Sequence, residues 1–418
     1  MGIPHWLAHP TTIDRDLTVA ATDDRFALSP HTLARCTQEG ITDLFAVQAA
    51  VIPVLRAAHA LSRLRQHVRD LCVSAPTGSG KTLAYVLPIV EKLRQRLVVR
   101  LRALVVLPTR DLAMQVKECF DRFCLGTDLR VGLATGDVSL AREQAMLVET
   151  APVRVGGASK VDILVCTPGR LVDHLATPNF SLQHLEFWVM DEADRLLGDA
   201  YHEWLPRVQA AVETARPAEP SAVPVHDACT VRDPLIKLQL LARPAPRIQK
   251  LLFSATLTQD PAKLARLQLT CPLYIAIAHG PGTFSFPATL REHYATCEPR
   301  DKPLMLLYML WQRRVAGAVC FAKSLEAAHR LAQIVQAWAA QVPDANITVA
   351  EYSSDLQAAE RSRIMHMFRR GQITLLICSD LIARGLDVGH VEAVINYDVP
   401  THMSQYTHRV GRTARAGR

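Results

Sequence analysis

An eight-residue loop, Ala75-Pro76-Thr77-Gly78-Ser79-Gly80-Lys81-Thr82, limits most strongly what this chain can fold into and bind. It follows the apolar run Leu71–Ser74 and precedes an apolar helical pattern that starts at Leu83, which predicts a strand, a loop and a helix. Small residues in such a loop let backbone N–H groups turn toward phosphate oxygens at the positive end of the helix. A glycine-rich turn that only packs is the alternative, but the flanking strand and helix favour a nucleoside triphosphate site.

Two side chains of this loop have specific expected roles. Lys81 is expected to reach the β- and γ-phosphates, and the Thr82 hydroxyl is expected to ligate Mg2+. The residues predicted to line the phosphates are Ala75, Thr77, Gly78, Ser79, Gly80, Lys81 and Thr82.

Length and composition indicate an intracellular globular protein. A chain of 418 residues is too long for one ordinary core, which predicts two domains. Its most apolar stretch, residues 303–322, is interrupted by Arg313 and Arg314, so it predicts a helix and a buried strand and no membrane partner. The ten cysteines show no metal-ligand spacing, and several lie inside apolar runs, which indicates free thiols in a reducing compartment. The formal net charge of +7 is compatible with an anionic partner.

Short apolar runs alternate with helical patterns along the chain, which is typical of parallel α/β sheets. Gly, Pro and Ser are frequent in residues 278–287, which indicates a linker, and residues 216–246 are rich in Pro and Ala, which indicates a surface insertion. The predicted strands before the linker are 71–75, 103–107, 163–166, 187–190 and 250–253, and those after it are 318–321, 347–351, 375–379 and 393–397.

A run of carboxylates, Asp191-Glu192-Ala193-Asp194, follows the predicted strand 187–190. The carboxyl end of a parallel strand is where open α/β sheets bind ligands. Asp191 is expected to hold Mg2+, partly through water, and Glu192 to orient and deprotonate the water that attacks the γ-phosphate. Such a run alone often only opens a helix. Downstream of a phosphate loop, it predicts hydrolysis of the triphosphate.

With these motifs in this order, the chain resembles the DEAD-box RNA helicases of helicase superfamily two, from about residue 26 to the last residue. The resemblance implies an α/β fold of two tandem RecA-like domains with mostly parallel sheets, with ATP in the cleft and single-stranded RNA across both. It divides the chain into an N-terminal extension (1–25), a first domain (26–278, with the insertion at about 216–246), a linker (279–289) and a second domain (290–418). Because the chain ends directly after an arginine motif, we expect the second domain to be truncated at its C-terminus.

The resemblance assigns adenine recognition to Gln48, whose amide can both donate to and accept from the base edge. Leu44 and Phe45 replace the residues usual in this segment, and Phe26 is the candidate for the upstream aromatic of the family.

The resemblance also implies RNA contacts at the ends of successive strands of the first domain. Arginines, hydroxyls and backbone N–H groups suit phosphate and 2′-OH contacts that grip RNA without reading its sequence. Each segment alone is more often a strand-to-helix turn with a capping Thr. The residues assigned to RNA here are Pro108, Thr109, Arg110, Gly136, Thr167 and Arg170. Those assigned to coupling hydrolysis with strand separation are Asp194, Ser254, Thr256 and His408.

In the second domain, the resemblance assigns RNA contacts to Arg361 and Ser379, and nucleotide contacts to Arg384, Gly385 and Asp387. Arg409 and Arg412 are three residues apart, which predicts one helical face, and both are expected to act as arginine fingers on the γ-phosphate. A basic run of this kind is ordinarily a solvated face or an RNA patch.

Taken together, the resemblance implies an ATP hydrolase that uses ATP and Mg2+ and acts as an RNA helicase, a monomer that unwinds short duplex RNA or remodels ribonucleoproteins. Two alternatives stay open: an ATP-gated RNA clamp or scaffold with little unwinding activity, and a nucleotide kinase or other phosphate-loop enzyme. Trp6-Leu7, Phe45–Gln48, the insertion and Ser353–Leu356 are similar to the branch that assembles the large ribosomal subunit. That similarity implies pre-rRNA and assembly-factor proteins as partners, in the nucleus and nucleolus.

Overall fold

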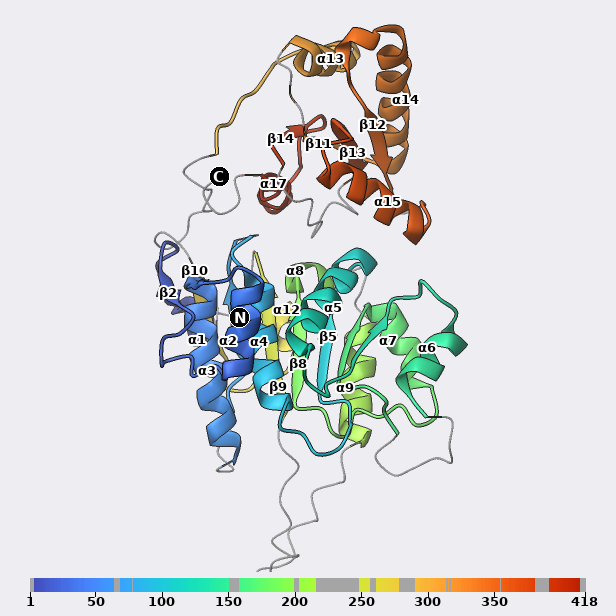
Figure 1. The fold of residues 1–418 in the computed structure, drawn as a ribbon. Helices are drawn as coiled ribbons and strands as arrows, with labels where there is room; N and C mark the ends of the chain where they lie inside the picture. Colours follow the sequence, from blue (N-terminus) through green and yellow to red (C-terminus); the bar gives the residue numbers. More distant parts are fainter. Residues whose placement is uncertain are drawn as a thin grey trace, which may run out of the picture. The chain divides into compact units, whose positions relative to one another are not determined.

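The computed structural model describes residues 4–63, 68–76, 78–149, 158–198, 203–215, 248–255, 261–277, 290–312, 315, 317–353, 355–379 and 391–413. It divides into two compact units, of which the first holds nearly all described residues before Ile277 and the second those that follow (Figure 1). The predicted insertion (216–246) and linker (279–289) lie outside the described residues.

An eight-stranded sheet forms the centre of the first unit. Its strands β9, β8, β5, β7 and β6 pair in parallel, so their carboxyl ends share one edge of the sheet. In spatial order the strands are β1 (Thr11–Ile13), β10 (Leu273–Ile277), β4 (Leu71–Ser74), β9 (Gln249–Ser254), β8 (Phe187–Asp191), β5 (Ala103–Val106), β7 (Ile163–Cys166) and β6 (Val131–Ala134).

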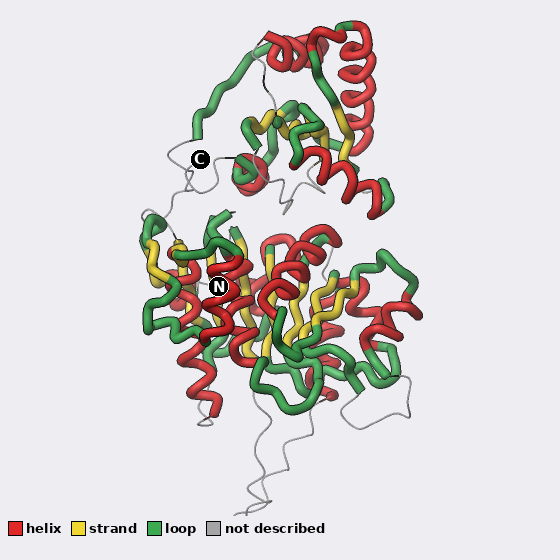
Figure 2. The backbone as a smooth tube through the Cα atoms, in the orientation of Figure 1, coloured by secondary structure: helices red, strands yellow, loops and turns green. Residues whose placement is uncertain are grey.

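Helices surround this sheet (Figure 2), and a small hairpin pairs β2 (Thr18–Ala20) with β3 (Asp43–Phe45). The helices are α1 (His5–Ala8), α2 (Pro30–Gln38), α3 (Ala46–Arg63), α4 (Lys81–Leu93), α5 (Arg110–Cys124), α6 (Leu140–Leu147), α7 (Pro168–Leu175), α8 (Ala193–Leu196), α9 (Trp204–Ala215) and α12 (Pro261–Ala265).

The central strands β5, β7 and β8 of the first sheet are buried on both faces, to which their side chains point alternately. On one face, Trp188 of β8 packs edge-on against Trp204 of α9, with ring centroids 6.1 Å apart. On the other, Tyr85 of α4 lies 5.1 Å from the Phe253 ring of β9 and 6.3 Å from the Phe120 ring of α5. Two apolar layers therefore fix the strands, and with them the loops at their carboxyl ends.

The second unit contains a four-stranded parallel sheet in the order β12 (Val349–Tyr352), β13 (Leu375–Ser379), β11 (Ala318–Ala322) and β14 (Ala393–Asn396). One apolar cluster joins Phe321 and Cys378 to Phe368 of α15, and another joins Cys320 and Ile377 to residues of α13 and α14. The helices are α13 (Lys302–Gln312), α14 (Leu325–Gln341), α15 (Ala358–Arg369) and α17 (Met403–Val410), with 3-10 turns at Pro299–Asp301 and Pro343–Ala345.

All nine predicted strands are confirmed, with ends that differ by two residues or fewer. The prediction missed the short strands β1, β2, β3, β6 and β10. In β6, Gly132 interrupts the apolar pattern. A larger residue would not fit here without a shift of its neighbours, because its Cβ would lie 2.5 Å from the Leu147 side chain. The helix and buried strand predicted for residues 303–322 correspond to α13 and β11.

The cysteines behave as expected from the sequence. All those in the described part of the chain are free thiols. Burial raises the pKa of Cys320 to about 12 and raises the pKa of Cys72 and Cys166 still further, so these thiols stay protonated. Among the described helices, none combines the length and apolar character that crossing a membrane requires.

Candidate functional site

The phosphate loop follows β4 and leads into α4, as the sequence predicts. Gly78 and Gly80 have φ values of +78° and +84°, which side chains with a Cβ rarely adopt. Lys81, the first residue of α4, donates from Nζ to the carbonyl oxygens of Ala75 (2.8 Å) and Pro76 (3.1 Å). The loop therefore carries an ammonium group at a helix N-terminus, which favours anionic ligands. Thr77 lies outside the described residues.

Gln48 lies in the first turn of α3, where its Oε1 accepts the backbone N–H of Phe45 at 2.8 Å. This contact is half of a capping box, and it fixes the orientation of the amide. Phe26, the candidate for the upstream aromatic, is fully buried. The exposed aromatic of this segment is Phe45, at 41%.

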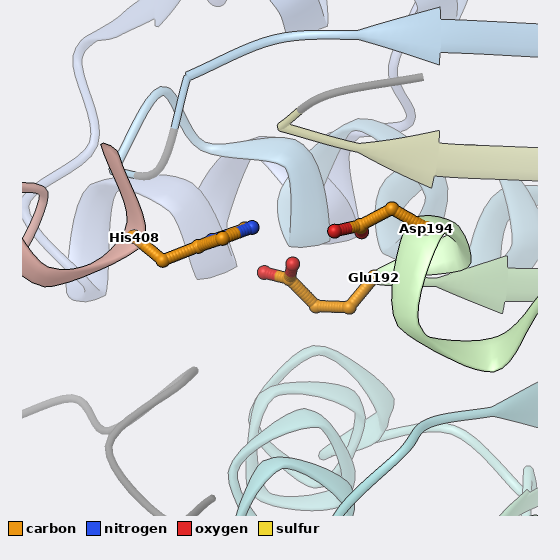
Figure 3. Close-up of side chains that lie close together, drawn as sticks. All are labelled: Glu192, Asp194 and His408. Carbon is orange, nitrogen blue, oxygen red and sulfur yellow. The ribbon is translucent and has the colours of Figure 1, made fainter. Parts of the chain in front are cut away.

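The acidic turn follows β8. Glu192 lies at the N-cap of α8 in the left-handed region, with φ +51° and ψ +49°, and Figure 3 shows its carboxylate and that of Asp194 pointing to the same side. Such a conformation is costly for a residue with a Cβ, and strained residues of this kind cluster at functional sites. Asp191 Oδ1 accepts the backbone N–H of Glu192 at 2.9 Å, which ties the Asp191 carboxylate to the backbone of the turn.

Tyr85 connects the two predicted magnesium ligands. Its hydroxyl donates to Asp191 Oδ2 at 2.9 Å and also hydrogen-bonds Thr82. Burial, and then the Asp191 carboxylate, raise the pKa of Tyr85 well above its ordinary value, so the hydroxyl stays protonated. Hydroxyl and carboxylate oxygens are hard donors of the kind Mg2+ prefers, so the residues present fit the expected ion.

We expect Tyr85→Phe to raise the Mg2+ concentration needed for half-maximal nucleotide binding by about tenfold, because Asp191 loses one oriented donor. Titrating Mg2+ against binding of a fluorescent ATP analogue measures this shift. Tyr308→Phe, which removes an exposed hydroxyl on α13, is the matched control and should match the unaltered protein. An unchanged midpoint in Tyr85→Phe would show that Tyr85 only fills the core.

Ser254 ends β9, and its hydroxyl donates to Asp194 Oδ1 at 2.8 Å. This bond joins the end of β9 to α8, which follows the adjacent strand β8. Thr256 lies outside the described residues.

The segments assigned to RNA follow β5, β6 and β7 along the same sheet edge. Thr109 caps α5 by accepting the N–H of Leu112 at 3.4 Å, so the capping alternative is confirmed for this residue. Pro108 precedes this cap, and Thr167 is the N-cap residue of α7. Arg110 is half exposed and lies 3.5 Å from Asp137, and Arg170 donates from Nη2 to the carbonyl of Val138 at 2.7 Å.

Gly136 lies close to both arginines. A Cβ on this residue would be 3.6 Å from Arg170 Nε and 3.7 Å from Arg110 Nη2, and its φ is +80°. Its backbone N–H donates to Glu143 at 2.9 Å, so that group is engaged within the protein. The positive φ, more than the space around the residue, is therefore what favours glycine at position 136.

Sequence reasoning missed Tyr85 and Glu143. Glu143 is buried on α6, four residues before the buried Leu147, so it occupies an apolar position of the helical pattern. Tyr85 is the one polar aromatic in the apolar run of α4. A polar group at a core position needs a buried partner, but the sequence does not show which distant residue supplies it.

In the second unit, Ser379 ends β13 and is buried, and Arg361 of α15 donates from Nη1 to the Leu356 carbonyl at 2.8 Å. Arg384, Gly385 and Asp387 lie outside the described residues.

The two predicted arginine fingers differ in their surroundings. Helix α17, which contains His408 and Arg409, ends at Val410, and Arg412 lies in the turn that follows. The prediction of one helical face for both arginines is therefore wrong. Arg409 donates from Nη1 to Asn396 Oδ1 (2.9 Å) and the Asp398 carbonyl (2.6 Å), and its guanidinium lies 5.1 Å from the centre of the Phe321 ring. Arg412 Nε donates to the His408 carbonyl at 3.1 Å.

Models of known protein families match most of this chain. The DEAD/DEAH box helicase model matches residues 45–264, and the helicase conserved C-terminal domain model matches residues 301–417. The chain belongs to the DEAD/DEAH box helicase family. This confirms the resemblance drawn from the motifs.

Among relatives in this helicase family, mouse ATP-dependent RNA helicase DDX51 is 42% identical over 446 residues, covering 100% of this chain and 66% of the relative. The fission yeast ATP-dependent RNA helicase dbp6 is 37% identical, covering 100% of this chain and 70% of the relative. The chain thus spans about two thirds of the length of the mouse and fission yeast proteins.

Solved structures of helicases share this fold. Mss116p bound to ssRNA and AMP-PNP aligns with a TM-score of 0.73 at 20% identity, covering 98% of this chain and 75% of that one. S. cerevisiae Dbp5 bound to RNA and ADP BeF3 aligns with a TM-score of 0.68 at 22% identity, covering 94% and 86%. The expected α/β fold with two RecA-like domains is confirmed.

Proposed function

We propose that this chain is an ATP-dependent RNA helicase, in which RNA-stimulated ATP hydrolysis drives local duplex unwinding or ribonucleoprotein remodelling. One observation carries the proposal. The carboxyl edge of the first sheet gathers the phosphate loop, the acidic turn and the arginines Arg110 and Arg170. On that edge the Ser254–Asp194 bond joins the end of β9 to the acidic turn.

Hydrolysis requires a bound triphosphate and an activated water. Lys81 and the N–H groups at the start of α4 bind the phosphates, and Gln48, oriented by Phe45, faces the base edge. When bound through Thr82 and Asp191, Mg2+ neutralises charge on the phosphate oxygens. Glu192, held in a fixed turn by Asp191, accepts the proton of the attacking water.

RNA binding supplies the trigger in this proposal. The arginines at the starts of α5 and α7 contact RNA phosphates, and Arg361 and Ser379 extend the contacts to the second domain. The domains close when ATP and RNA are both bound, which brings arginines of the second domain to the γ-phosphate. Release of phosphate reopens them.

The proposed cellular role is assembly of the large ribosomal subunit. It rests on the sequence features similar to that branch, together with the 42% identity to DDX51. We propose pre-rRNA and assembly factors as partners, a monomeric state, and a nuclear or nucleolar location.

ATPase measurements with and without single-stranded RNA test the function directly. We expect RNA to stimulate ATP hydrolysis and ATP to be preferred over GTP. Gln48→Ala should weaken that preference for ATP, because the amide supplies the base-edge contacts. Gln38→Ala, at the end of α2, is the control. ATPase activity that ignores RNA would refute the proposal, and strand displacement on short duplexes would separate unwinding from clamping.

A further inference from the structure

We propose that Glu143 is a positioning residue for RNA binding, which sets the two arginines at the edge of the first sheet in a binding-ready arrangement. The inference rests on the proposed RNA site and adds a residue that lies beneath that site. It follows from four hydrogen bonds that meet at one buried carboxylate.

Both carboxylate oxygens of Glu143 have two partners. Oε1 accepts the backbone N–H groups of Thr135 (3.2 Å) and Gly136 (2.9 Å). Oε2 lies 2.8 Å from Arg170 Nε and 2.9 Å from His174 Nε2. The loop after β6 and the start of α7 are therefore joined through a single side chain on α6.

This carboxylate is buried, and its contacts are consequently strong. Glu143 is 2% exposed, and His174 is fully buried. A charge removed from water is tolerated only where donors satisfy it, and a hydrogen bond to an ionised group is stronger than one between neutral groups. The four hydrogen bonds thus fix the Glu143 carboxylate, and the carboxylate in turn fixes the positions of its four partners.

The arrangement extends from Glu143 to both arginines. Arg170 is bound directly, and Glu143 anchors the backbone of Gly136, where an added Cβ would be in van der Waals contact with both Arg170 and Arg110. The Thr135 hydroxyl donates to Asp137 Oδ2 at 2.7 Å, and Asp137 lies 3.5 Å from Arg110. Because these groups are fixed before RNA binds, less conformational entropy is lost on binding.

A second carboxylate on Arg170 provides a matched comparison. Asp173 accepts from Arg170 Nη1 at 3.3 Å, but its side chain is 52% exposed. Exposed ion pairs of this kind contribute little, so Asp173 is not expected to position the guanidinium.

The test compares Glu143→Gln with Asp173→Asn in RNA-stimulated ATPase assays. A glutamine cannot accept from Arg170 and His174 while also accepting from both backbone N–H groups. We expect Glu143→Gln to raise the RNA concentration for half-maximal stimulation by about tenfold, with kcat at saturating RNA and the KM for ATP within about twofold of the unaltered protein. Asp173→Asn should change the RNA concentration by less than about twofold.

Arg170→Lys provides a second variant in case Glu143→Gln does not fold. Lysine keeps the positive charge but loses the Nε contact, so its RNA requirement should rise about as much as in Glu143→Gln. If both single variants fold, the double variant should raise the RNA requirement by no more than the larger of the two single increases, because both substitutions remove the same contact.

Three outcomes overturn the inference: an unchanged RNA requirement in folded Glu143→Gln, equal increases in the RNA and ATP requirements, or a lower kcat at an unchanged RNA requirement. An unaltered protein that RNA does not stimulate would instead refute the proposed function, so the two failures are distinct.

Discussion

Glu192→Gln is expected to reduce ATP turnover by about a thousandfold or more while ATP and RNA still bind. Glutamine has nearly the same size and the same backbone requirement as glutamate, so the left-handed turn at the N-cap of α8 is retained. What is lost is the carboxylate that accepts the proton of the attacking water. Because Asp191 keeps its bonds to Tyr85 and to the residue 192 N–H, the neighbouring Mg2+ ligand is preserved.

Single-turnover hydrolysis and binding of a fluorescent ATP analogue, measured side by side, separate the two effects. Glu186→Gln is the matched control, since Glu186 directly precedes the same strand β8 at its opposite end and pairs with Arg102 there. The control should retain full turnover. Near-normal hydrolysis in Glu192→Gln would remove Glu192 from the role of general base.

Most of this site could be predicted because its residues lie next to strong apolar runs. The strands at 103–106, 163–166 and 187–191 are buried throughout, so their ends, and the motifs that follow, are visible in the sequence. The phosphate loop and the acidic turn are such motifs, and both lie where the pattern places them.

The contacts between distant segments could not be predicted in the same way. Tyr85 and Asp191 are 106 residues apart, and nothing in either local sequence indicates the hydrogen bond between them. Glu143 would ordinarily be assigned to the solvent face of its helix, because a single carboxylate in an amphipathic pattern rarely enters the core. Only the donors supplied by the loop after β6 and by α7 make its burial possible.

The different surroundings of the two arginines in the arginine motif could not be predicted from the sequence either. In the sequence, Arg409 and Arg412 are equivalent basic residues at helical spacing. In the structure the helix ends between them, and Arg409 bonds to Asn396 and Asp398 within its own domain. Substitutions at the two positions should therefore have different consequences.

Arg412→Lys is expected to lower kcat by about a thousandfold with little change in thermal stability, because lysine cannot reproduce the planar donors that neutralise transition-state charge. Arg409→Lys should instead destabilise the second domain by about 2 kcal/mol, because the guanidinium bonds to Asn396 and Asp398 and its contact with Phe321 are lost.

Thermal unfolding and single-turnover ATPase measurements on both variants show whether Arg412 alone or both arginines act as arginine fingers on the γ-phosphate. Asn396→Ala serves as a further control, since it removes one partner of Arg409 and leaves every arginine in place. If Arg409 is mainly structural, Arg409→Lys and Asn396→Ala should both lower the melting temperature by several degrees. Hydrolysis should then fall much less in these two variants than in Arg412→Lys. If instead Arg409→Lys melts normally and loses as much activity as Arg412→Lys, its bonds within the domain do not prevent it from acting on the phosphate, and both arginines are fingers.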